Sequence, residues 1–416
     1  CDRDTFNAWL SSLPIKVEML LENPCREINA SQNGKEKQYS QVTFIGTGTL
    51  GSNIIDHFVR AGISNRICIV DFDIYFSHNI SRHILQPRDI MKPKASCIKK
   101  HFEGIVGTKI WSIDKNVMCL SPNEEKVAFD NTDLIVDAST SIAVERKLAL
   151  SSKYEGKRKC TLFLNPKGND LVLLLEDTNG EQRLDLLEMS YQYNLIKSDT
   201  LANHLDTAEQ RKTNNFSCRS ESNVLDYDNV GMLASVASQQ IQRATSNTDC
   251  QLGIWRVNDN DSTISKVNLD VLSWNVKVIN NISVYYSKEL VAEIDKYRNS
   301  DLRKETGGCL FGCYDKDARN IYVFYQHHAP KDSKCSATFF ERGCNGMNDV
   351  LDKINKRTYH QVRYLGEWHS HPNACCSPSS LDKEQFTKMS EQMSDEDLPF
   401  VQLIMGTNGI YLNAIM

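Results

Sequence analysis

Two patterns of hydrophobic and polar positions divide the chain. From residue 41 to about 175, short apolar runs alternate with segments whose apolar residues recur at helical spacing. Strands that alternate with helices predict a mostly parallel sheet with helices on both faces. The predicted strands are Val42–Ile45, Arg66–Val70, Lys109–Ile113, Leu134–Val136, Thr161–Leu164 and Leu171–Leu175, and the predicted helices are Gly51–Arg60, Pro93–Phe102 and Ile142–Leu150.

The later part of the chain has a less regular pattern. Leu184–Leu205 is polar with an apolar stripe, which favours a packed surface helix, and Tyr227–Ala244 is a second helical run. Beyond residue 275, strand-like and helical segments follow one another without strict alternation, which predicts an α+β unit. Its predicted strands are Val276–Tyr285, Ile321–Tyr325 and Val401–Ile404, and its predicted helices are Glu289–Tyr297 and Leu381–Met389.

These patterns predict four segments in the 416 residues. Residues 1–38 are a lead-in, 39–250 a Rossmann-like α/β domain with a doubly wound, mostly parallel sheet, 251–274 a polar boundary region, and 275–416 an α+β domain. The boundary is marked by polar runs at 246–249 and at 258–261.

Composition narrows the class of protein. A hydrophobic content of 40% and a charged content of 24% are ordinary for a globular protein, and the net charge of −5 argues against a nucleic-acid partner. We find no membrane-length apolar run and no secretory signal. The fourteen cysteines include no Cys-x-x-Cys, which favours reduced thiols and the cytoplasm. The chain begins with Cys1 rather than Met, so it is compatible with a fragment that lacks targeting sequences.

The strongest chemical signal is a set of metal-ligand types at 366–382. Tyr364 and Leu365 lead into a strand, on which His369 and His371 point to the same face. Asp382 follows eleven residues later, near the start of a helix. Two imidazoles and a carboxylate leave one coordination position open for water, as catalytic zinc requires.

This motif resembles the JAMM/MPN (JAB-type) zinc metalloproteases, which remove ubiquitin and ubiquitin-like proteins. Ser379 and Asp382 stand eight and eleven residues after the second histidine, as in that family, and Glu305 precedes a glycine-rich strand. The resemblance covers roughly residues 275–416. It implies that zinc activates a water molecule, that Glu305 takes and returns its proton, and that Ser379 stabilises the oxyanion.

A second motif lies at the start of the predicted parallel sheet. Gly46, Gly48 and Gly51 form a Gly-x-Gly-x-x-Gly loop that enters a helix, where free N–H groups favour a phosphate. Asp71 lies twenty residues past Gly51, where an acidic residue binds a ribose hydroxyl. By itself this motif fits a nicotinamide dehydrogenase as well as an ATP-binding enzyme.

The residues after Asp71 decide between these readings. Asp73, Asn79, Arg82 and Lys94 follow in the order seen in the ThiF-like adenylating family, which includes ubiquitin-activating enzymes, and the segment is similar to that family. The resemblance implies ATP as the cofactor, with Asp71 on the ribose and the amide and cations around the triphosphate.

The magnesium site departs from the family pattern. Asp137 follows the strand Leu134–Val136, but Thr140 stands where the family has a second acidic residue. We expect Asp137, Asp73 or a water molecule to serve magnesium; the alternative is that adenylation is weakened.

Cys218 is the candidate thioester cysteine. It lies in a polar loop beside Arg219, just before a helix, a setting that lowers a thiol pKa. Related activating enzymes often carry an acyl-accepting cysteine at this place.

The two motifs together resemble bacterial fusions of a ThiF-like activating domain with a JAB-type protease. This resemblance implies a bifunctional enzyme that adenylates the C-terminal glycine of a small ubiquitin-like protein, transfers it through Cys218 to a conjugating enzyme or acceptor, and trims or deconjugates it. ATP, magnesium and zinc are the expected cofactors, and a homodimer is the expected assembly. Three alternatives stay open: sulfur-carrier activation, a nicotinamide oxidoreductase, and a non-catalytic scaffold.

Overall fold

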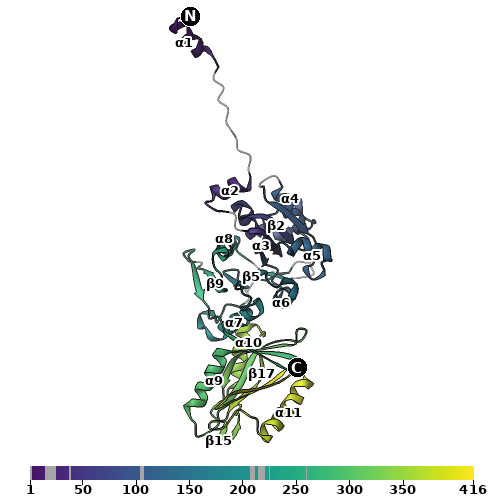
Figure 1. Ribbon diagram of the computed structural model, residues 1–416, viewed down its shortest axis with the longest axis vertical. Coiled ribbons are helices and arrows are strands. Elements are labelled where there is room, and N and C mark those ends of the chain that lie inside the picture. Colours follow the sequence, from purple (N-terminus) through teal and green to yellow (C-terminus); the bar gives the residue numbers. More distant parts are fainter. Residues whose placement is uncertain are drawn as a thin grey trace.

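Two large β-sheets organise the protein. The computed structural model describes residues 2–14, 25–36, 39–103, 107–206, 211–213, 221–223, 225–258 and 260–416. An eight-stranded sheet lies in the N-terminal half and a seven-stranded sheet in the C-terminal half, with α7 and α10 between them (Figure 1). The predicted fold class, a doubly wound α/β domain followed by an α+β domain, is confirmed.

The first sheet has the strand order β10-β9-β6-β5-β4-β1-β2-β3. The five strands from β5 to β3 are parallel, whereas β6, β9 and β10 are antiparallel additions. The carboxyl ends of β1 and β4 are neighbours, with Ile45 in register with Asp137, so ligands are expected at this edge. The strands are β1 (Tyr39–Ile45), β2 (Ser64–Val70), β3 (Lys109–Ile113), β4 (Leu134–Asp137), β5 (Arg158–Leu164), β6 (Asp170–Leu175), β9 (Gln251–Val257) and β10 (Ile264–Asn268).

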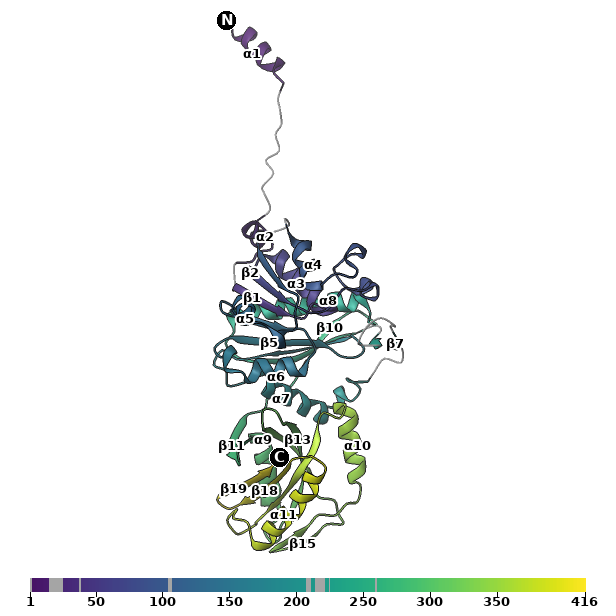
Figure 2. The same ribbon diagram turned by 90° about the vertical axis from the view of Figure 1, so that its right-hand side faces the viewer.

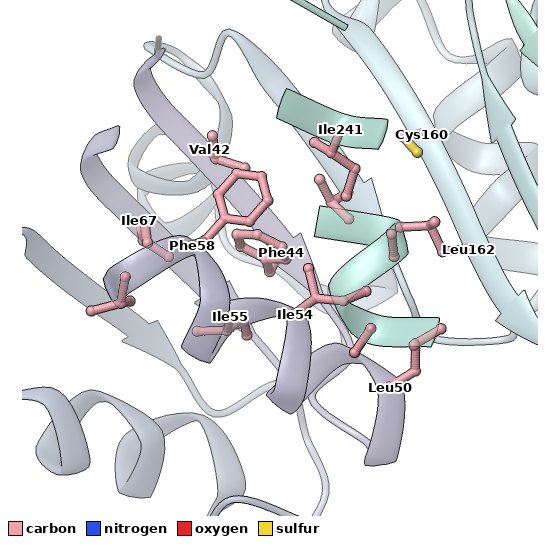
Figure 3. Close-up of a cluster of buried hydrophobic side chains, with 14 of the residues drawn as sticks. Val42, Phe44, Leu50, Ile54, Ile55, Phe58, Ile67, Cys160, Leu162 and Ile241 are labelled. Atoms are coloured by element: carbon pink, nitrogen blue, oxygen red, sulfur yellow. The ribbon is translucent and has the colours of Figure 1, made fainter. Parts of the chain in front are cut away.

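Helices cover both faces of this sheet, and each face has its own core. On one face α3 and α8 pack together over β1, and Phe58 meets Phe44 edge-to-face (Figures 2 and 3). On the other face α5, α6 and α7 bury a second apolar cluster. The helices are α2 (Arg26–Gln32), α3 (Thr49–Ala61), α4 (Lys94–Phe102), α5 (Pro122–Phe129), α6 (Ile142–Leu150), α7 (Leu184–Lys197) and α8 (Tyr227–Arg243).

The second sheet has the order β11-β12-β14-β13-β17-β18-β19. Helix α9 packs on one face, and α10 packs on the other together with α7 of the first half. The elements are β11 (Trp274–Ile279), β12 (Ile282–Ser287), α9 (Lys288–Ser300), β13 (Gly307–Asp315), β14 (Asn320–His328), β15 (Lys334–Ser336), β16 (Phe339–Glu341), α10 (Met347–Thr358), β17 (Arg363–Ser370), α11 (Ser380–Asp395), β18 (Phe400–Gly406) and β19 (Gly409–Ile415).

The remaining elements are short or peripheral. Helix α1 (Arg3–Ser12) has no buried residue. Strands β7 (Arg211–Thr213) and β8 (Glu221–Asn223) form a separate two-stranded antiparallel sheet. None of the helices in the described ranges combines the length and apolarity needed to cross a membrane.

The prediction of a surface helix at Leu184–Leu205 was wrong. Helix α7 ends at Lys197 and is buried on nearly all sides, because it lies between the two halves and packs against both. Two of its buried polar side chains have partners: the Ser190 hydroxyl donates to the Leu186 carbonyl, and the Asn194 amide donates to the Asp270 carbonyl. Polar residues on this helix therefore mark an interface, not a solvent face.

Two predicted boundaries also need correction. The region 251–274 is not a linker, because β9 and β10 within it complete the first sheet. The lead-in 1–38 also contains a packed element, since the Arg26 guanidinium at the start of α2 donates to the carbonyl of Gly62, the residue just after α3. Short polar turns and true linkers have the same composition, so the pattern alone could not separate them.

The single strand predicted at Val276–Tyr285 is a hairpin. Asn280 and Asn281 both have left-handed backbone angles (φ 50° and 62°), which is the geometry of a tight two-residue hairpin turn. Asparagine tolerates this region better than most residues. The two adjacent asparagines indicate this turn in the sequence, whereas the hydrophobic pattern runs through them as if the strand were continuous.

The two halves share a buried charge cluster that yields a stability prediction. Arg146 on α6 is paired with Glu145 and with Glu188 on α7, and its Nε lies 3.9 Å from Asp315 Oδ2 in the second half. Replacing Arg146 with Met leaves two buried carboxylates without their cation, so we expect unfolding free energy to fall by about 3–5 kcal/mol. Thermal unfolding measures this loss.

An exposed arginine supplies the control. Arg60 pairs with Asp56 one helical turn away and is largely exposed. Arg60→Met should cost no more than about 0.5 kcal/mol. Equal melting temperatures for the two variants would contradict a structural role for the buried cluster.

Candidate metal centre and nucleotide pocket

Three predicted metal ligands come together in the C-terminal half. His369 and His371 lie at and just after the end of β17, and Asp382 lies in the first turn of α11. Their ligand atoms all lie within 4.8 Å of one another. His369 Nε2 is 3.1 Å from Asp382 Oδ1, and His371 Nε2 is 3.5 Å from Asp382 Oδ2.

Surrounding groups orient these side chains. His371 Nδ1 faces the Cys375 carbonyl at 2.8 Å, so Nδ1 carries the proton and the Nε2 lone pair is free toward Asp382. The Arg298 guanidinium donates to the backbone carbonyls of His371 and Pro372, at 3.2 and 2.6 Å. The end of β17 is thus fixed both by the Cys375 carbonyl, which contacts the His371 ring, and by Arg298, which contacts the backbone.

The acidic ligand is held by helix capping. The Ser379 backbone N–H donates to Asp382 Oδ2 at 2.7 Å, and the Asp382 N–H donates to the Ser379 hydroxyl oxygen at 3.2 Å. These two hydrogen bonds form a capping box, in which the Ser379 hydroxyl only accepts, so its proton stays available to another acceptor. Burial opposes ionisation of Asp382, but the adjacent imidazoles of His369 and His371 hold its pKa well below the usual range.

Glu305 lies beside the same cluster. Thr306, the next residue, exchanges two hydrogen bonds with Ser370, which lies between the two histidines. The Glu305 side chain is buried, and burial raises its pKa although the two imidazoles oppose the rise. Gly307 allows this approach, because a Cβ there would lie 2.3 Å from the Phe340 ring and 2.5 Å from the Trp368 carbonyl.

The donor set fits zinc. Two imidazole nitrogens and a carboxylate converge, the tautomer of His371 suits metal binding through Nε2, and a second carboxylate, that of Glu305, lies beside them. Cys375 and Cys376 lie in the loop between the ligands but are not members of the cluster. His328 is not a member of the cluster either; its ring stacks on that of Tyr297, with the ring centroids 4.4 Å apart.

A cavity of about 490 Å³ lies at the carboxyl edge of the first sheet. Gly46, Gly48, Asp71 and Asp73 all line it. Gly46 has φ +84° and passes within van der Waals contact of the Ser139 backbone, so a side chain there would clash. Helix α3 begins at this cavity without a side-chain cap at Gly48, which leaves its N–H groups for an anion.

The two aspartates of this cavity, Asp71 and Asp73, have different hydrogen-bond partners. Asp71 Oδ2 accepts hydrogen bonds from the Thr47 N–H and hydroxyl, and its Oδ1 accepts from the Asp73 N–H. Three of its roughly four acceptor positions are thus occupied, which leaves one for a ribose hydroxyl. Asp73 Oδ2 accepts from Lys94 Nζ at 2.9 Å and is half exposed.

The remaining nucleotide-site predictions lie around the cavity rather than on its wall. Asn79 caps a short 3-10 helix (Ser77–Arg82) by accepting from the Phe76 N–H. Burial lowers the pKa of His78, and the positive charges of Arg82 and Lys94 lower it further. Both cations therefore lie close enough to His78 to affect its ionisation. Gly51 lets α3 pass close to the Gly46 carbonyl, where a Cβ would lie at 2.3 Å.

Asp137 is the residue that best fits magnesium. It is 1% exposed, and its Oδ1 accepts from the Ser139 N–H. Its Oδ2 is buried with no hydrogen-bond partner in the described part of the chain. A buried orphan oxygen at the edge of a nucleotide cavity fits a cation ligand. Thr140 has φ +57°, a strained value for a β-branched residue, and lies on the cavity wall.

Asp137 gives a pH-dependent stability prediction. Burial raises its pKa to about 6 from 3.8, so the folded state resists losing this proton. The stability associated with the protonated form is present below about pH 4 and is lost as pH rises through about 6. We expect Asp137→Asn to raise the melting temperature relative to wild type by several degrees near pH 7.5, about 2 kcal/mol, with little gain near pH 4. The same offset at both pH values would contradict this account.

Two family models match separate parts of this chain. Residues 26–161 match the model of the ThiF family, and residues 287–412 match the model of prokaryotic homologs of the JAB domain. The chain joins a ThiF domain to a JAB domain. Both resemblances predicted from the motifs are therefore confirmed, and the ThiF match favours adenylation over hydride transfer.

Curated relatives carry related names. A CD-NTase/cGAS isopeptidase from Enterobacter hormaechei subsp. hoffmannii is 32% identical over 24% of this chain and 55% of its own length. A protein of the same name from Pseudomonas aeruginosa is 25% identical over 33% of this chain and 85% of its own. The ATP-dependent ubiquitin transferase-like protein Cap2 of P. aeruginosa is 27% identical over 33% of this chain and 25% of its own length. The chain thus spans about half of the first relative and a quarter of Cap2.

Solved structures give only a distant likeness. Escherichia coli MccB with MccA-N7isoASN has a TM-score of 0.39 and 12% identity, over 58% of this chain and 66% of that one. PaaA has a TM-score of 0.40 and 11% identity, over 65% and 87%.

The sequence did not predict one residue that supports the metal centre, and one predicted site residue lies outside the described part of the chain. The candidate thioester residue Cys218 lies outside the described residues. Arg298, which holds the strand end at His371, was not predicted, because it lies on α9 and is remote in sequence from every motif. Contacts of this kind become visible only in the folded chain.

Proposed function

We propose that this protein is a bifunctional enzyme of a ubiquitin-like modification pathway. Its ThiF half adenylates the C-terminal glycine of a small ubiquitin-like protein, and its JAB half hydrolyses the amide or isopeptide bonds formed by that protein. The observation that carries the proposal is the convergence of His369, His371 and Asp382 beside a buried Glu305. The names of the relatives, isopeptidase and ubiquitin transferase-like protein, support the same pairing of activities.

In the ThiF half, the chain's own groups supply binding and charge. The Gly46–Gly48 loop and the uncapped start of α3 hold phosphate oxygens. Lys94, released from Asp73 or shared with it, neutralises charge on the triphosphate, and Arg82 adds a planar guanidinium. When bound, ATP would supply the adenylyl group that the glycine carboxylate accepts, with pyrophosphate as the leaving group, and Asp137 is the residue that would hold the magnesium.

In the JAB half, Glu305 and Ser379 are the proton-transfer and oxyanion groups. Bound zinc supplies a Lewis acid that lowers the pKa of water and polarises a carbonyl. Glu305 is buried next to the ligands, and its raised pKa suits a group that accepts a proton and then returns it to a leaving amine. The Ser379 hydroxyl has its oxygen engaged by Asp382 and its proton available for an oxyanion.

The finer parts of the proposal follow from the family resemblance. Cys218 accepts the activated glycine as a thioester and passes it to a conjugating enzyme, and two copies associate through the ThiF half. The enzyme acts in the cytoplasm, where ATP is supplied and thiols stay reduced.

Two assays on the full chain test the proposal. ATP–pyrophosphate exchange that depends on a candidate ubiquitin-like protein reports adenylation, and cleavage of a Gly–Gly isopeptide joined to a lysine side chain reports the JAB activity. We expect both, with a thioester sensitive to thiols after the first reaction. A thiocarboxylate product instead would favour sulfur-carrier activation, and NAD binding without ATP binding would reject the adenylation half.

A further inference from the structure

A second cavity, of about 350 Å³, lies where the two halves meet. Strand β5, the start of α6 and helix α7 supply the walls from the ThiF half, and the end of α10 with the loop after it supplies the wall from the JAB half. Figure 2 shows α7 and α10 on either side of this junction. Representative lining residues are Phe163, Tyr191, Leu205, Thr358, Tyr359 and Gln361.

This cavity is the neighbour of the nucleotide cavity. Four residues line both, and they form the wall between them. One of these is the strained Thr140, so the strained backbone stands where the two cavities meet. A molecule in the second cavity therefore ends next to the nucleotide. The four shared residues are Thr140, Ser141, Phe163 and Leu164.

Two buried polar atoms in this cavity have no partner. Thr161 is 3% exposed and Gln192 is 5% exposed, and both residues line the cavity. Thr161 Oγ1 and Gln192 Oε1 have no hydrogen-bond partner within the described ranges. Buried polar atoms without partners, beside apolar side chains such as Phe163 and Leu205, fit a ligand that offers both hydrogen-bonding groups and an apolar body. An extended peptide has this chemistry.

The charge of the cavity favours a basic peptide. Glu145 and Glu188 both line it, and Arg146 pairs with both of them. Burial and the neighbouring Glu188 raise the pKa of Glu145, because one guanidinium does not offset two ionised carboxylates. A lysine or arginine side chain in the peptide would supply the second cation that these two carboxylates accept.

Tyr359 brings an aromatic ring of the JAB half to this cavity. It is 59% exposed and has φ +49°, and His360 follows with φ +61°. Two consecutive non-glycine residues in the left-handed region are unusual, and an exposed aromatic side chain held in this way favours a binding role.

We propose that this cavity binds the C-terminal tail of the protein that the ThiF half adenylates, and that Tyr359 of the JAB half is a specificity-determining residue for that tail. This inference rests on the proposed adenylation and deepens it. The tail carboxylate passes the Thr140–Ser141 wall to reach the nucleotide, while the backbone of the preceding residues pairs with Thr161 and Gln192. The JAB half is then part of the activating site.

Peptide binding to the full chain tests this without turnover. The probe is fluorescein-Ala-Leu-Lys-Gly-Gly with a free carboxylate, measured by fluorescence anisotropy with a non-hydrolysable ATP analogue present. We expect saturable binding to wild type that Tyr359→Ala and Thr161→Val each weaken by at least about fivefold. Replacing the lysine of the probe with glutamate should weaken binding as well.

His360→Ala is the matched control. His360 is exposed and has the same backbone region as its neighbour, but it does not line the cavity. It should change peptide affinity less than about twofold. Thr161→Val keeps side-chain shape, so it guards against loss of affinity through misfolding, which melting temperature also monitors.

The outcomes separate the tail site from adenylation itself. Absence of saturable binding to wild type, or an unchanged affinity in both cavity variants, overturns the tail site. Pyrophosphate exchange by wild type judges adenylation independently: exchange with unaltered peptide affinity in the variants rejects only the tail site. Peptide binding that follows the expected order without any exchange supports the tail site and rejects adenylation.

Discussion

Glu305→Gln is expected to lower isopeptide cleavage by about 10²–10⁴-fold, the usual contribution of a positioned general acid–base group. The substitution keeps the shape of a buried side chain that lies beside the His369 and His371 cluster. The amide cannot accept a proton, so the chemical step is affected while the ligand set is not. Cleavage of a quenched Gly–Gly–lysine isopeptide substrate measures the loss, and zinc content measured alongside should stay at the wild-type level.

An exposed glutamate supplies the comparison for this substitution. Glu391 lies on α11, the helix that carries Asp382, but it is exposed and its side chain is not part of the cluster. Glu391→Gln should therefore leave cleavage within about twofold of wild type. Cleavage by Glu305→Gln at a rate similar to that of Glu391→Gln would show that Glu305 is not the proton-transfer group.

Lys94→Ala is expected to weaken ATP binding by about 10- to 100-fold, since a hydrogen bond to a charged group contributes about 1.5–3 kcal/mol. Lys94 is buried, and its ammonium group lies 2.9 Å from Asp73, which lines the nucleotide cavity. The position brings a point charge to the cavity where a triphosphate would lie. Isothermal titration with ATP and magnesium measures the affinity, and pyrophosphate exchange should fall at least in proportion.

Lys92 is the matched lysine. It lies two residues earlier, is largely exposed, and donates to the Arg88 carbonyl instead of facing the cavity. Lys92→Ala should change ATP affinity less than about twofold. Equal losses in the two variants would mean that general electrostatics, and not the placement of Lys94, accounts for nucleotide affinity.

Local patterns predicted much of the metal centre. The two-residue period of a strand was enough to place His369 and His371 on one face, and a capping signal was enough to place Asp382 at a helix start. Glu305 was assigned only through family resemblance. Its place depends on the pairing of β13 with β17, where Gly307 is in register with His369, and no local pattern reports that pairing.

Features that depend on the association of the two halves were not predictable from the sequence. The polar residues of α7 suggested a surface helix because the pattern does not show that a second domain packs on that side. The second cavity is formed by Thr161, Gln192 and Tyr359, which are far apart in sequence and belong to no motif. Tertiary packing, not local propensity, brings these residues together.

Zinc content is the most direct test of the central claim that His369, His371 and Asp382 form a catalytic metal centre. We expect purified wild-type protein to contain about one zinc ion per chain by elemental analysis, and His369→Ala and Asp382→Ala to lose most of it. His360→Ala, at an exposed histidine outside the cluster, should retain it. Wild-type protein without stoichiometric zinc, or ligand variants that bind zinc as well as wild type, would contradict the account.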